Sequence, residues 1–360
     1  MNTCCKSSNW QLIIRAMSLR SLLITALLTV CAGLCIRSSF AATSVATDPV
    51  GYMSYTVAAA IDASTPSTTA LCIPLQDVVS GTGAITGQVT GISANTISNS
   101  AAGWSASAFA VTGAPCFVRI KSGAAKGLTL LITANSATDL TVDPQGMDLT
   151  TLGITPNTDT YQIIAGDTLL SLFGTNTLGG TSADTADNVM YYNGSAWQTF
   201  YYNTTNNRWQ QKGIGISANN FVLRPDAGLL FVRRATTSLS FTVTGAIPTS
   251  DLRYLVNNSG STFIANGFPT DTALSAVGYN NLPNWVSSPD GQSADLVMFW
   301  NGSSWQRFYY NSTNNRWQQV GLGINANNFT IPAGKPVVIA RIGSTSGSAL
   351  LAHTIPYVLN

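Results

Sequence analysis

The chain has 360 residues, of which 45% are hydrophobic and only 9% charged, and its formal net charge is +2. This composition is too apolar and aromatic for a disordered chain. All 15 acidic residues are Asp, and the abundant Ser, Thr, Asn and Gly favour turns and strand edges over helices. We therefore expect an all-β protein built from sandwich- or barrel-like domains.

Residues 1–41 have the pattern of a secretory signal peptide. An apolar run of about 16 residues at positions 21–36 precedes Ser39 and Ala41, which place small residues at −3 and −1 of a cleavage site after Ala41. A membrane-spanning helix needs about 20 residues, so a retained anchor is the weaker alternative. Met17 is a second candidate for the start of translation. We expect export to the extracellular space or outer cell surface, with the periplasm as the alternative, and no membrane span after cleavage.

Cleavage would change the charge of the mature chain. Four of the 17 basic residues lie before residue 41, which leaves 13 against 15 acidic residues and a net charge of about −2. Binding to nucleic acid requires a basic surplus that neutralises phosphates. We therefore expect no nucleic-acid partner.

The mature chain retains Cys72 and Cys116, because the other four of the six cysteines lie in the signal segment. Each of the two stands in an apolar, strand-like run. In an oxidising compartment such a pair favours one disulfide. Two buried free thiols are the alternative.

Residues 42–166 form the expected N-terminal β domain. Apolar runs such as residues 50–57 and 128–133 are bounded by Gly, Asn, Ser and Asp, which is typical of strands and turns. A short helix is expected directly after this domain, with Asp167 or Thr168 as its N-cap.

A repeat is the strongest internal signal. Residues 187–221 align without gaps with residues 295–329, with 26 identities in 35 positions and a constant offset of 108. This spacing indicates a duplicated module of about 100 residues, not a solenoid. We place the first aromatic β module at residues 167–265 and the second at residues 266–360.

Each copy predicts a three-stranded meander. Asn193-Gly194 and Asn301-Gly302 stand between apolar runs, which is the strongest short-range hairpin signal. Strand parity then divides the side chains between two faces. The face that contains Val189 keeps its size and polarity in both copies, so we assign it to the core. The other face carries aromatic rings and a Thr-to-Arg difference.

This second face supplies the candidate ligand-stacking residues. They are Tyr192, Trp197, Tyr201, Trp300, Trp305 and Tyr309. If exposed, such rings stack on sugars or pack against a partner. The alternative is that the tryptophans fill the space between sheets.

Four short segments follow one another along the chain: residues 47–52 (TDPVGY), 120–127 (IKSGAAKG), 166–173 (GDTLLSLF) and 191–197 (YYNGSAW). In this order they resemble a family of exported proteins of verrucomicrobial Gram-negative bacteria. The resemblance implies export. It implies no chemistry, because that family has no established activity.

The sequence carries no strong motif for catalysis, metal binding or a cofactor. His353 is the only histidine and would have to serve any Ser-His-Asp triad, but no Gly-x-Ser-x-Gly elbow precedes it. One histidine and two mature cysteines disfavour zinc. Asp184, Asp187, Asp290 and Asp295 allow a calcium site, but turn capping is favoured. We expect no metal and no cofactor.

These observations favour a non-enzymatic structural or adhesive protein, secreted or held on the cell surface, whose partner is a glycan or another surface protein. A carbohydrate-binding protein that uses the duplicated aromatic faces is the alternative. A secreted hydrolase with paired carboxylates is the third reading.

Overall fold

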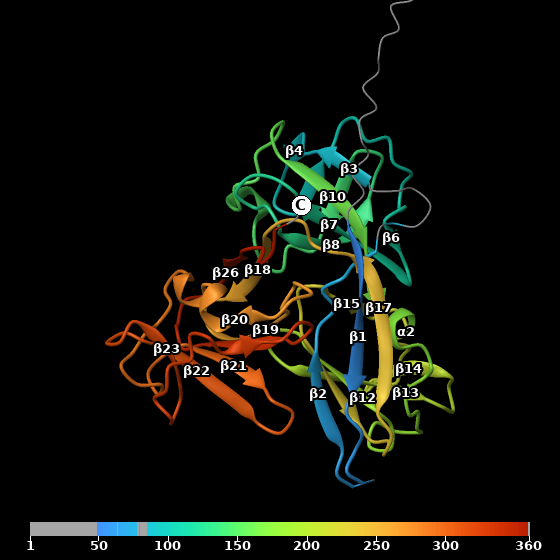
Figure 1. The fold of residues 1–360 in the computed structure, drawn as a ribbon. Coiled ribbons are helices and arrows are strands. Elements are labelled where there is room, and N and C mark those ends of the chain that lie inside the picture. The colour runs from blue at the N-terminus through green and yellow to red at the C-terminus, as the bar shows by residue number, and fades with distance from the viewer. Residues whose placement is uncertain (1–48, 63, 78, 80–84, 359–360) are drawn as a thin grey trace, which may run out of the picture. The chain divides into compact units, whose positions relative to one another are not determined.

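A computed structural model describes residues 49–62, 64–77, 79 and 85–358. Antiparallel strands dominate these residues, as the composition predicted (Figure 1). The strand order of every sheet is open, so the sheets are sandwich-like. The expected signal peptide at residues 1–41, with its cleavage site and Met17, lies outside the described residues.

Residues 85–165 form a sheet of their own, here called the inserted domain. The strand order is β3 (Ile85–Gln88), β10 (Thr160–Ala165), β7 (Ala114–Ile120), β8 (Thr129–Asn135), β9 (Asp139–Val142), β5 (Thr96–Ser98) and β4 (Gly91–Ile92), and β6 (Ala110–Val111) pairs with β7. A 3-10 turn, η1 (Leu149–Thr151), follows β9. The buried side chains of these strands form a separate core.

Two further sheets have five strands each and share one strand order. The first is β14 (Arg208–Gln211), β13 (Trp197–Asn203), β12 (Asn188–Tyr192), β16 (Leu229–Arg233) and β2 (Ser67–Leu71). The second is β23 (Arg316–Gln319), β22 (Trp305–Asn311), β21 (Leu296–Trp300), β25 (Val337–Arg341) and β19 (Gly260–Ile264). The repeated segment therefore occupies equivalent strands of two similar sheets.

Each five-stranded sheet is accompanied by two pairs of strands. In the first module they are β1 (Val50–Val57) with β17 (Leu239–Ala246) and β11 (Asp167–Thr168) with β15 (Val222–Leu223). In the second module they are β18 (Leu252–Asn257) with β26 (Ser348–His353) and β20 (Thr272–Ala273) with β24 (Thr330–Ile331). The second module also contains the 3-10 turns η2 (Leu274–Ala276) and η3 (Tyr279–Asn281).

The strand pairing crosses the expected domain boundaries at residues 166 and 265. β1 and β2 lie before residue 166 but pair with β17 and β16 of the first module, and Figure 1 shows the blue β1 along the yellow β17. β18 and β19 lie before residue 265 but pair with β26 and β25. The inserted domain thus interrupts the first module. The repeat marks only the central strands, so the strands that complete each sheet carried no signal.

The predicted meander and its two faces are confirmed by the strand register. Val189 pairs with Phe200, and Tyr192 pairs with Trp197 across the turn. The side-chain oxygen of Asn193 accepts a hydrogen bond from the backbone N–H of Ser195 at 3.0 Å. The same arrangement recurs around Asn301 and Gly302 in the second module. The face assigned to the core is buried, and Val189 and Phe200 are each 1% exposed.

The expected short helix is α2 (Leu169–Phe173). Thr168 is its N-cap: the Thr168 hydroxyl accepts from the Ser171 N–H at 3.1 Å, and the Thr168 N–H donates to the Ser171 hydroxyl at 2.8 Å. This reciprocal pair is a capping box. The helix buries Leu169 and Phe173 in the core of the first module.

The disulfide expected between Cys72 and Cys116 is not formed, and both thiols are free and buried. Cys72 follows β2, and its sulfur lies 3.5 Å from the carbonyl oxygen of Asn266. Cys116 packs in the core of the inserted domain. The two side chains are therefore held in different environments. Burial raises the pKa of Cys72 to about 12, so this thiol stays protonated at neutral pH.

Candidate binding site

The two modules meet at two junctions that use the same elements reciprocally. In the first junction, residues 224–228 of the first module lie against β19 of the second. The backbone N–H of Ala265 donates to the carbonyl of Asp226 at 3.0 Å, and the N–H of Gly228 donates to the carbonyl of Phe263 at 3.1 Å. These bonds tie the turn after β15 to the edge of the other sheet.

In the second junction, residues 332–336 of the second module lie against β2 of the first. The backbone N–H of Cys72 donates to the carbonyl of Gly334 at 2.9 Å, and the amine of Lys335 donates to the carbonyl of Ala70 at 3.1 Å. Gly334 lies 108 positions after the aspartate that accepts from Ala265, so these two backbone bonds are equivalent. The modules therefore pack with approximate two-fold reciprocity, as the halves of a symmetric dimer do.

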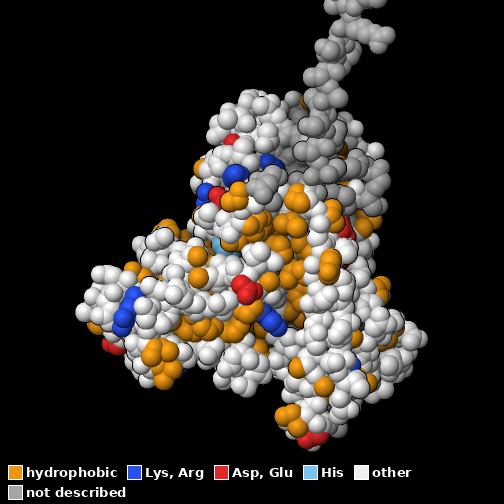
Figure 2. Space-filling model, viewed as in Figure 1, with side chains coloured by type: hydrophobic (Ala, Val, Ile, Leu, Met, Phe, Trp, Pro, Cys, Tyr) orange, Lys and Arg blue, Asp and Glu red, His pale blue; other side chains and the backbone are white. Residues whose placement is uncertain are grey.

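The second faces of the two meanders contribute to one apolar cluster between the modules. This inter-module cluster is built on Ala70, Leu230, Phe263 and Val338, with Met190, Tyr192, Met298, Trp300 and Trp305 packed against it. Hydrophobic side chains also gather between the modules on the face shown in Figure 2. Much of the predicted aromatic surface is thus covered by the other module.

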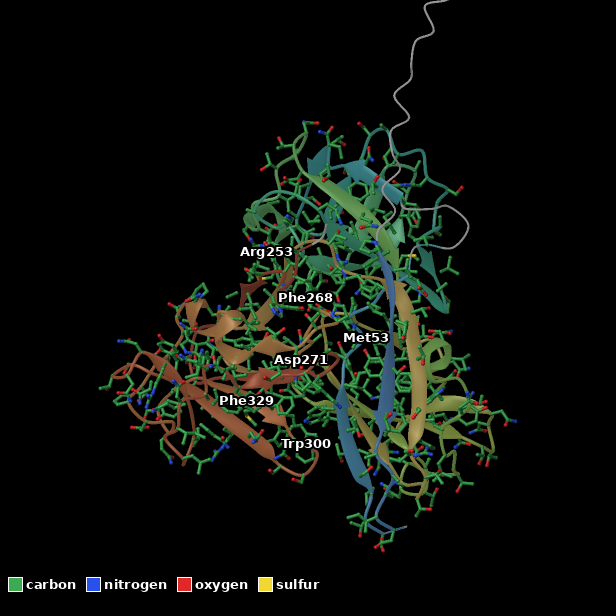
Figure 3. All side chains as sticks on the ribbon, viewed as in Figure 1. Met53, Arg253, Phe268, Asp271, Trp300 and Phe329 are labelled. Carbon is green, nitrogen blue, oxygen red and sulfur yellow. The ribbon has the colours of Figure 1, made fainter. Side chains whose placement is uncertain are left out.

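Three of the candidate stacking residues have different surroundings. Trp197 is 39% exposed and packs edge-on against Phe263, with ring centroids 5.6 Å apart. Trp305 also packs edge-on against the ring of Phe263, with ring centroids 6.2 Å apart. Trp300 donates its indole N–H to the carbonyl of Thr68 in β2 at 2.9 Å, and Figure 3 shows it between the two modules. Only Trp197 keeps a large free surface.

Tyr201 and Tyr309 do not join this cluster. The hydroxyl of Tyr309 donates to the side-chain oxygen of Gln318 at 2.9 Å, and the ring is 6% exposed. The equivalent Tyr201 donates to Gln210 at 3.5 Å and is half-buried. Tyr309 is therefore closed to a stacking ligand, because a polar network at the far end of the meander holds it.

A cavity of about 330 Å³ lies at the first junction. Its lining comes from the inserted domain (Asp143, Gln145), the first module (Tyr191, Tyr192, Asn193, Gly194, Arg224, Asp226, Ala227) and the second module (Tyr254, Leu255, Asn257, Thr262, Phe263, Ile264, Ser348). The volume is at the lower end of the range for small-molecule sites, about 300–1,000 Å³. Of the six candidate stacking residues, Tyr192 alone lines this junction pocket.

A charged group stands in the wall of the junction pocket. The guanidinium of Arg224 contacts Asp226 at 3.2 Å through Nε and Asp143 at 3.1 Å through Nη1. Its third nitrogen, Nη2, is buried and has no hydrogen-bond partner among the described residues. Gln145 donates from its side chain to Asp226 at 3.4 Å. The wall of the pocket thus contains an unpaired donor beside carboxylate acceptors.

Local sequence explains how Arg224 and Asp226 reach the pocket together. The N–H of Ala227 donates to the carbonyl of Arg224 at 3.2 Å, which closes a turn with Pro225 at its second position, where proline is favoured. Burial lowers the pKa of Arg224, but the neighbouring carboxylates raise it more, so the net shift is upward. Burial raises the pKa of Tyr191 to about 12, which keeps its hydroxyl protonated.

The second module contributes polar residues to the lining of the pocket. The N–H of Asn257 donates to the hydroxyl of Thr262 at 3.0 Å, and its side-chain amide donates to the carbonyl of Ser261 at 3.3 Å. The hydroxyl of Ser348 donates to the Asn257 side-chain oxygen at 3.3 Å. A fixed amide and two hydroxyls therefore line the same pocket as the charged group.

The residues of this site were not among the sequence-based candidates, except Tyr192. At the offset of 108, Arg224 corresponds to Pro332 and Asp226 to Gly334. Tyr192 corresponds to Trp300. A search for polar groups present in only one copy would have indicated the pocket.

The four aspartates considered for calcium have other partners. Asp187 is ion-paired with Arg233, and Asp295 accepts from the Nε of Arg341 at 2.7 Å. Both carboxylates are buried. Asp184 contacts a lysine amine at 2.9 Å, and Asp290 accepts two backbone N–H bonds in a turn. Within residues 49–62, 64–77, 79 and 85–358, no group of three or more His, Cys, Asp or Glu is placed to hold a metal ion.

His353 lies in the core of the second module. It is 2% exposed, and its ring packs edge-on against Phe268 with centroids 4.7 Å apart. Burial lowers the pKa of His353 to about 4, opposed by Asp251. The imidazole is therefore neutral at pH 7 and closed to a substrate.

No protein-family model, curated protein or solved structure matches the chain. In the part of the chain that the structure describes, no helix has the length and apolar character needed to cross a membrane.

Proposed function

We propose that the protein is exported and acts without catalysis, as a structural or adhesive protein that holds its partner at the junction pocket. One observation carries the proposal: two reciprocal junctions share their backbone contacts, yet only the first lines this pocket with Arg224, Asp143 and Asp226. Burying an unpaired polar group costs stability, so Nη2 of Arg224 beside two carboxylates supports a polar partner at this junction. Nη1 of Arg341 is also buried without a partner, but it lies in the core of the second module. The signal-peptide pattern and the family resemblance support export.

A glycan is the partner that this pocket favours. The lining combines tyrosine rings with amides, hydroxyls and carboxylates, and sugars present both apolar C–H faces and hydroxyl groups to such surfaces. The lining supports a carbohydrate site in the pocket, and the cover over most of the duplicated aromatic faces disfavours a site there.

Retention on immobilised surfaces tests the proposal. The purified chain is passed over a panel of neutral and charged glycans and cell-surface proteins, as wild type, Tyr192→Ala and Tyr201→Ala. Both tyrosines are half-buried on the same meander face, but only Tyr192 lines the pocket. We expect retention by at least one surface, at least tenfold weaker for Tyr192→Ala and unchanged for Tyr201→Ala. Absence of retention on every surface, or recovery of the protein from the cytoplasm, would overturn the proposal.

A further inference from the structure

We propose that the junction pocket binds a single uncharged pyranose unit, whose vicinal hydroxyls bridge Asp143 and the Nη2 group of Arg224. This inference rests on the proposed function, since it names the ligand class of the same pocket. Four observations support it: an unused donor, an accessible acceptor, the net charge of the lining and its apolar wall.

The unused donor is the first observation. The Arg224 side chain is only 10% exposed, and two of its three nitrogens already contact carboxylates. The buried Nη2 lacks a partner. A buried donor without an acceptor costs about 1–3 kcal/mol or more. Nη2 has almost no accessible surface of its own, so a ligand oxygen removes this penalty when the Arg224 side chain turns Nη2 towards the pocket.

The accessible acceptor is the second observation. The side chain of Asp143 is 44% exposed, whereas that of Asp226 is 14% exposed. One Asp143 oxygen contacts Arg224 and the other accepts from the backbone N–H of Gln145 at 2.9 Å. Each carboxylate oxygen has a second lone pair that a ligand hydroxyl can use. A hydroxyl group both donates and accepts, so two neighbouring hydroxyls satisfy the carboxylate and the guanidinium together. An ammonium group only donates and leaves Nη2 unpaired.

The net charge of the pocket lining disfavours negatively charged sugars. Asp143, Asp226 and Arg224 are the charged residues in the lining, which gives two negative charges against one positive charge. A carboxylate or sulfate on the ligand would meet a net charge of −1 at short range. At separations of about 4 Å near a protein surface, such repulsion reaches several kcal/mol. Uronic acids and sulfated sugars are therefore disfavoured.

The apolar wall gives the sugar ring a surface. Tyr192, Phe263 and Ile264 line the pocket beside the polar groups. The ring of Tyr192 is itself held by Trp197, with centroids 5.3 Å apart. Aromatic rings supply apolar area with a fixed orientation. Because Trp197 packs against Tyr192, we expect its fluorescence to respond to an occupied pocket, and Trp197→Phe identifies its share of the signal among the eight tryptophans.

Titration of the full chain with single sugars tests the inference. Tryptophan fluorescence and calorimetry follow glucose, galactose and mannose, with glucuronic acid and glucosamine as charged comparators. We expect wild type to bind at least one neutral hexose at least tenfold more tightly than glucuronic acid. Asp143→Asn should bind that hexose at least fivefold more weakly and narrow the gap to glucuronic acid, because it removes a charge but keeps an acceptor.

Arg224→Lys keeps the positive charge but lacks the planar fork, so we expect at least tenfold weaker binding. Asp143 is partly exposed, so Asp143→Asn is informative even if Arg224→Lys fails to fold. Asp184→Asn, at an exposed ion pair outside the pocket, is the matched control and should bind as wild type does. Tighter binding of glucuronic acid or glucosamine, or wild-type affinity in Asp143→Asn, would overturn the inference. If no sugar binds but a protein surface still retains the chain through Tyr192, the proposed function stands and this inference fails.

Discussion

At the first junction, Tyr192 and Phe263 stand beside the turn that carries Arg224, and a cavity remains between them. At the second junction, the equivalent of Tyr192 is Trp300, which reaches β2 and donates its indole N–H to the carbonyl of Thr68. Ala70 in β2 lies in the same inter-module cluster. Equivalent backbone contacts thus border a polar pocket at the first junction and a packed tryptophan at the second junction. The comparison indicates that a few side chains decide whether the same backbone contact leaves a cavity or is filled by packing.

Both modules contain a buried ion pair, and its loss is expected to have the largest effect on stability. Asp295 and Arg341 have fully buried side chains, and in the first module Asp187 pairs with Arg233, whose side chain is 7% exposed. Removing one partner of a buried pair costs about 3–5 kcal/mol, because the other charge is left uncompensated. We expect Asp295→Asn to lower the free energy of unfolding by about 3–5 kcal/mol, and Asp187→Asn to have a similar but not larger effect.

Denaturant-induced unfolding measures this prediction. Asp290→Asn is the control, because Asp290 lies in an exposed turn where an amide oxygen also accepts backbone bonds. Its effect should stay below about 0.5 kcal/mol. A loss under about 1 kcal/mol in Asp295→Asn would contradict a structural role for the pair.

A buried histidine distinguishes the second module from the first, where the equivalent position is Gly245. Burial lowers the pKa of His353 to about 4 from an ordinary value of 6.5. Because the folded pKa is below the unfolded one, the contribution to stability is complete above about pH 6.5 and is lost as pH falls towards 4. We expect a loss of about 3 kcal/mol across this window.

The comparison variant is His353→Phe, which removes the titrating group. Its unfolding free energy should change with pH less steeply than that of wild type between pH 6.5 and 4. Denaturant midpoints at half-unit steps of pH measure the difference. Equal slopes in the two proteins would show that His353 does not titrate on unfolding.

The junction comparison predicts that removing the polar group of Trp300 lowers stability more than removing that of Tyr192. Trp300→Phe removes the hydrogen bond to Thr68, so we expect a stability loss of about 1–2 kcal/mol. Tyr192→Phe keeps the ring and should change stability by less than about 0.5 kcal/mol. Thermal and denaturant unfolding of both variants measure the difference. A larger loss in Tyr192→Phe would reverse the roles assigned to the two junctions.

The sequence predicted features set by neighbouring residues, but not those formed by residues far apart in the chain. The Asn193-Gly194 turn, the register of β12 with β13 and the cap at Thr168 follow from neighbours in the chain, and the structure has all three. The membership of β1 and β2 depends on pairing with strands far along the chain. The pocket also brings together Asp143, Arg224 and Asn257 from three parts of the chain. Such a site leaves no local pattern, and only a comparison of the two copies could have indicated it.

The smallest expected effect lies in the two hairpin turns, where the modules are nearly identical. Gly194 and Gly302 have φ of 96° and 104°, a backbone region that L-residues seldom adopt. We expect Gly194→Ala and Gly302→Ala to lower the unfolding free energy by about 1 kcal/mol each, equal within about 0.5 kcal/mol. They should differ in binding, because a Cβ at Gly194 would lie 3.9 Å from the side-chain amide of Asn257 in the pocket, whereas a Cβ at Gly302 meets nothing within 4 Å. Sugar titration should therefore show a small loss, under about fivefold, for Gly194→Ala alone. An equal loss in both variants would mean that the second junction also contributes to binding, and the distinction between the junctions would fail.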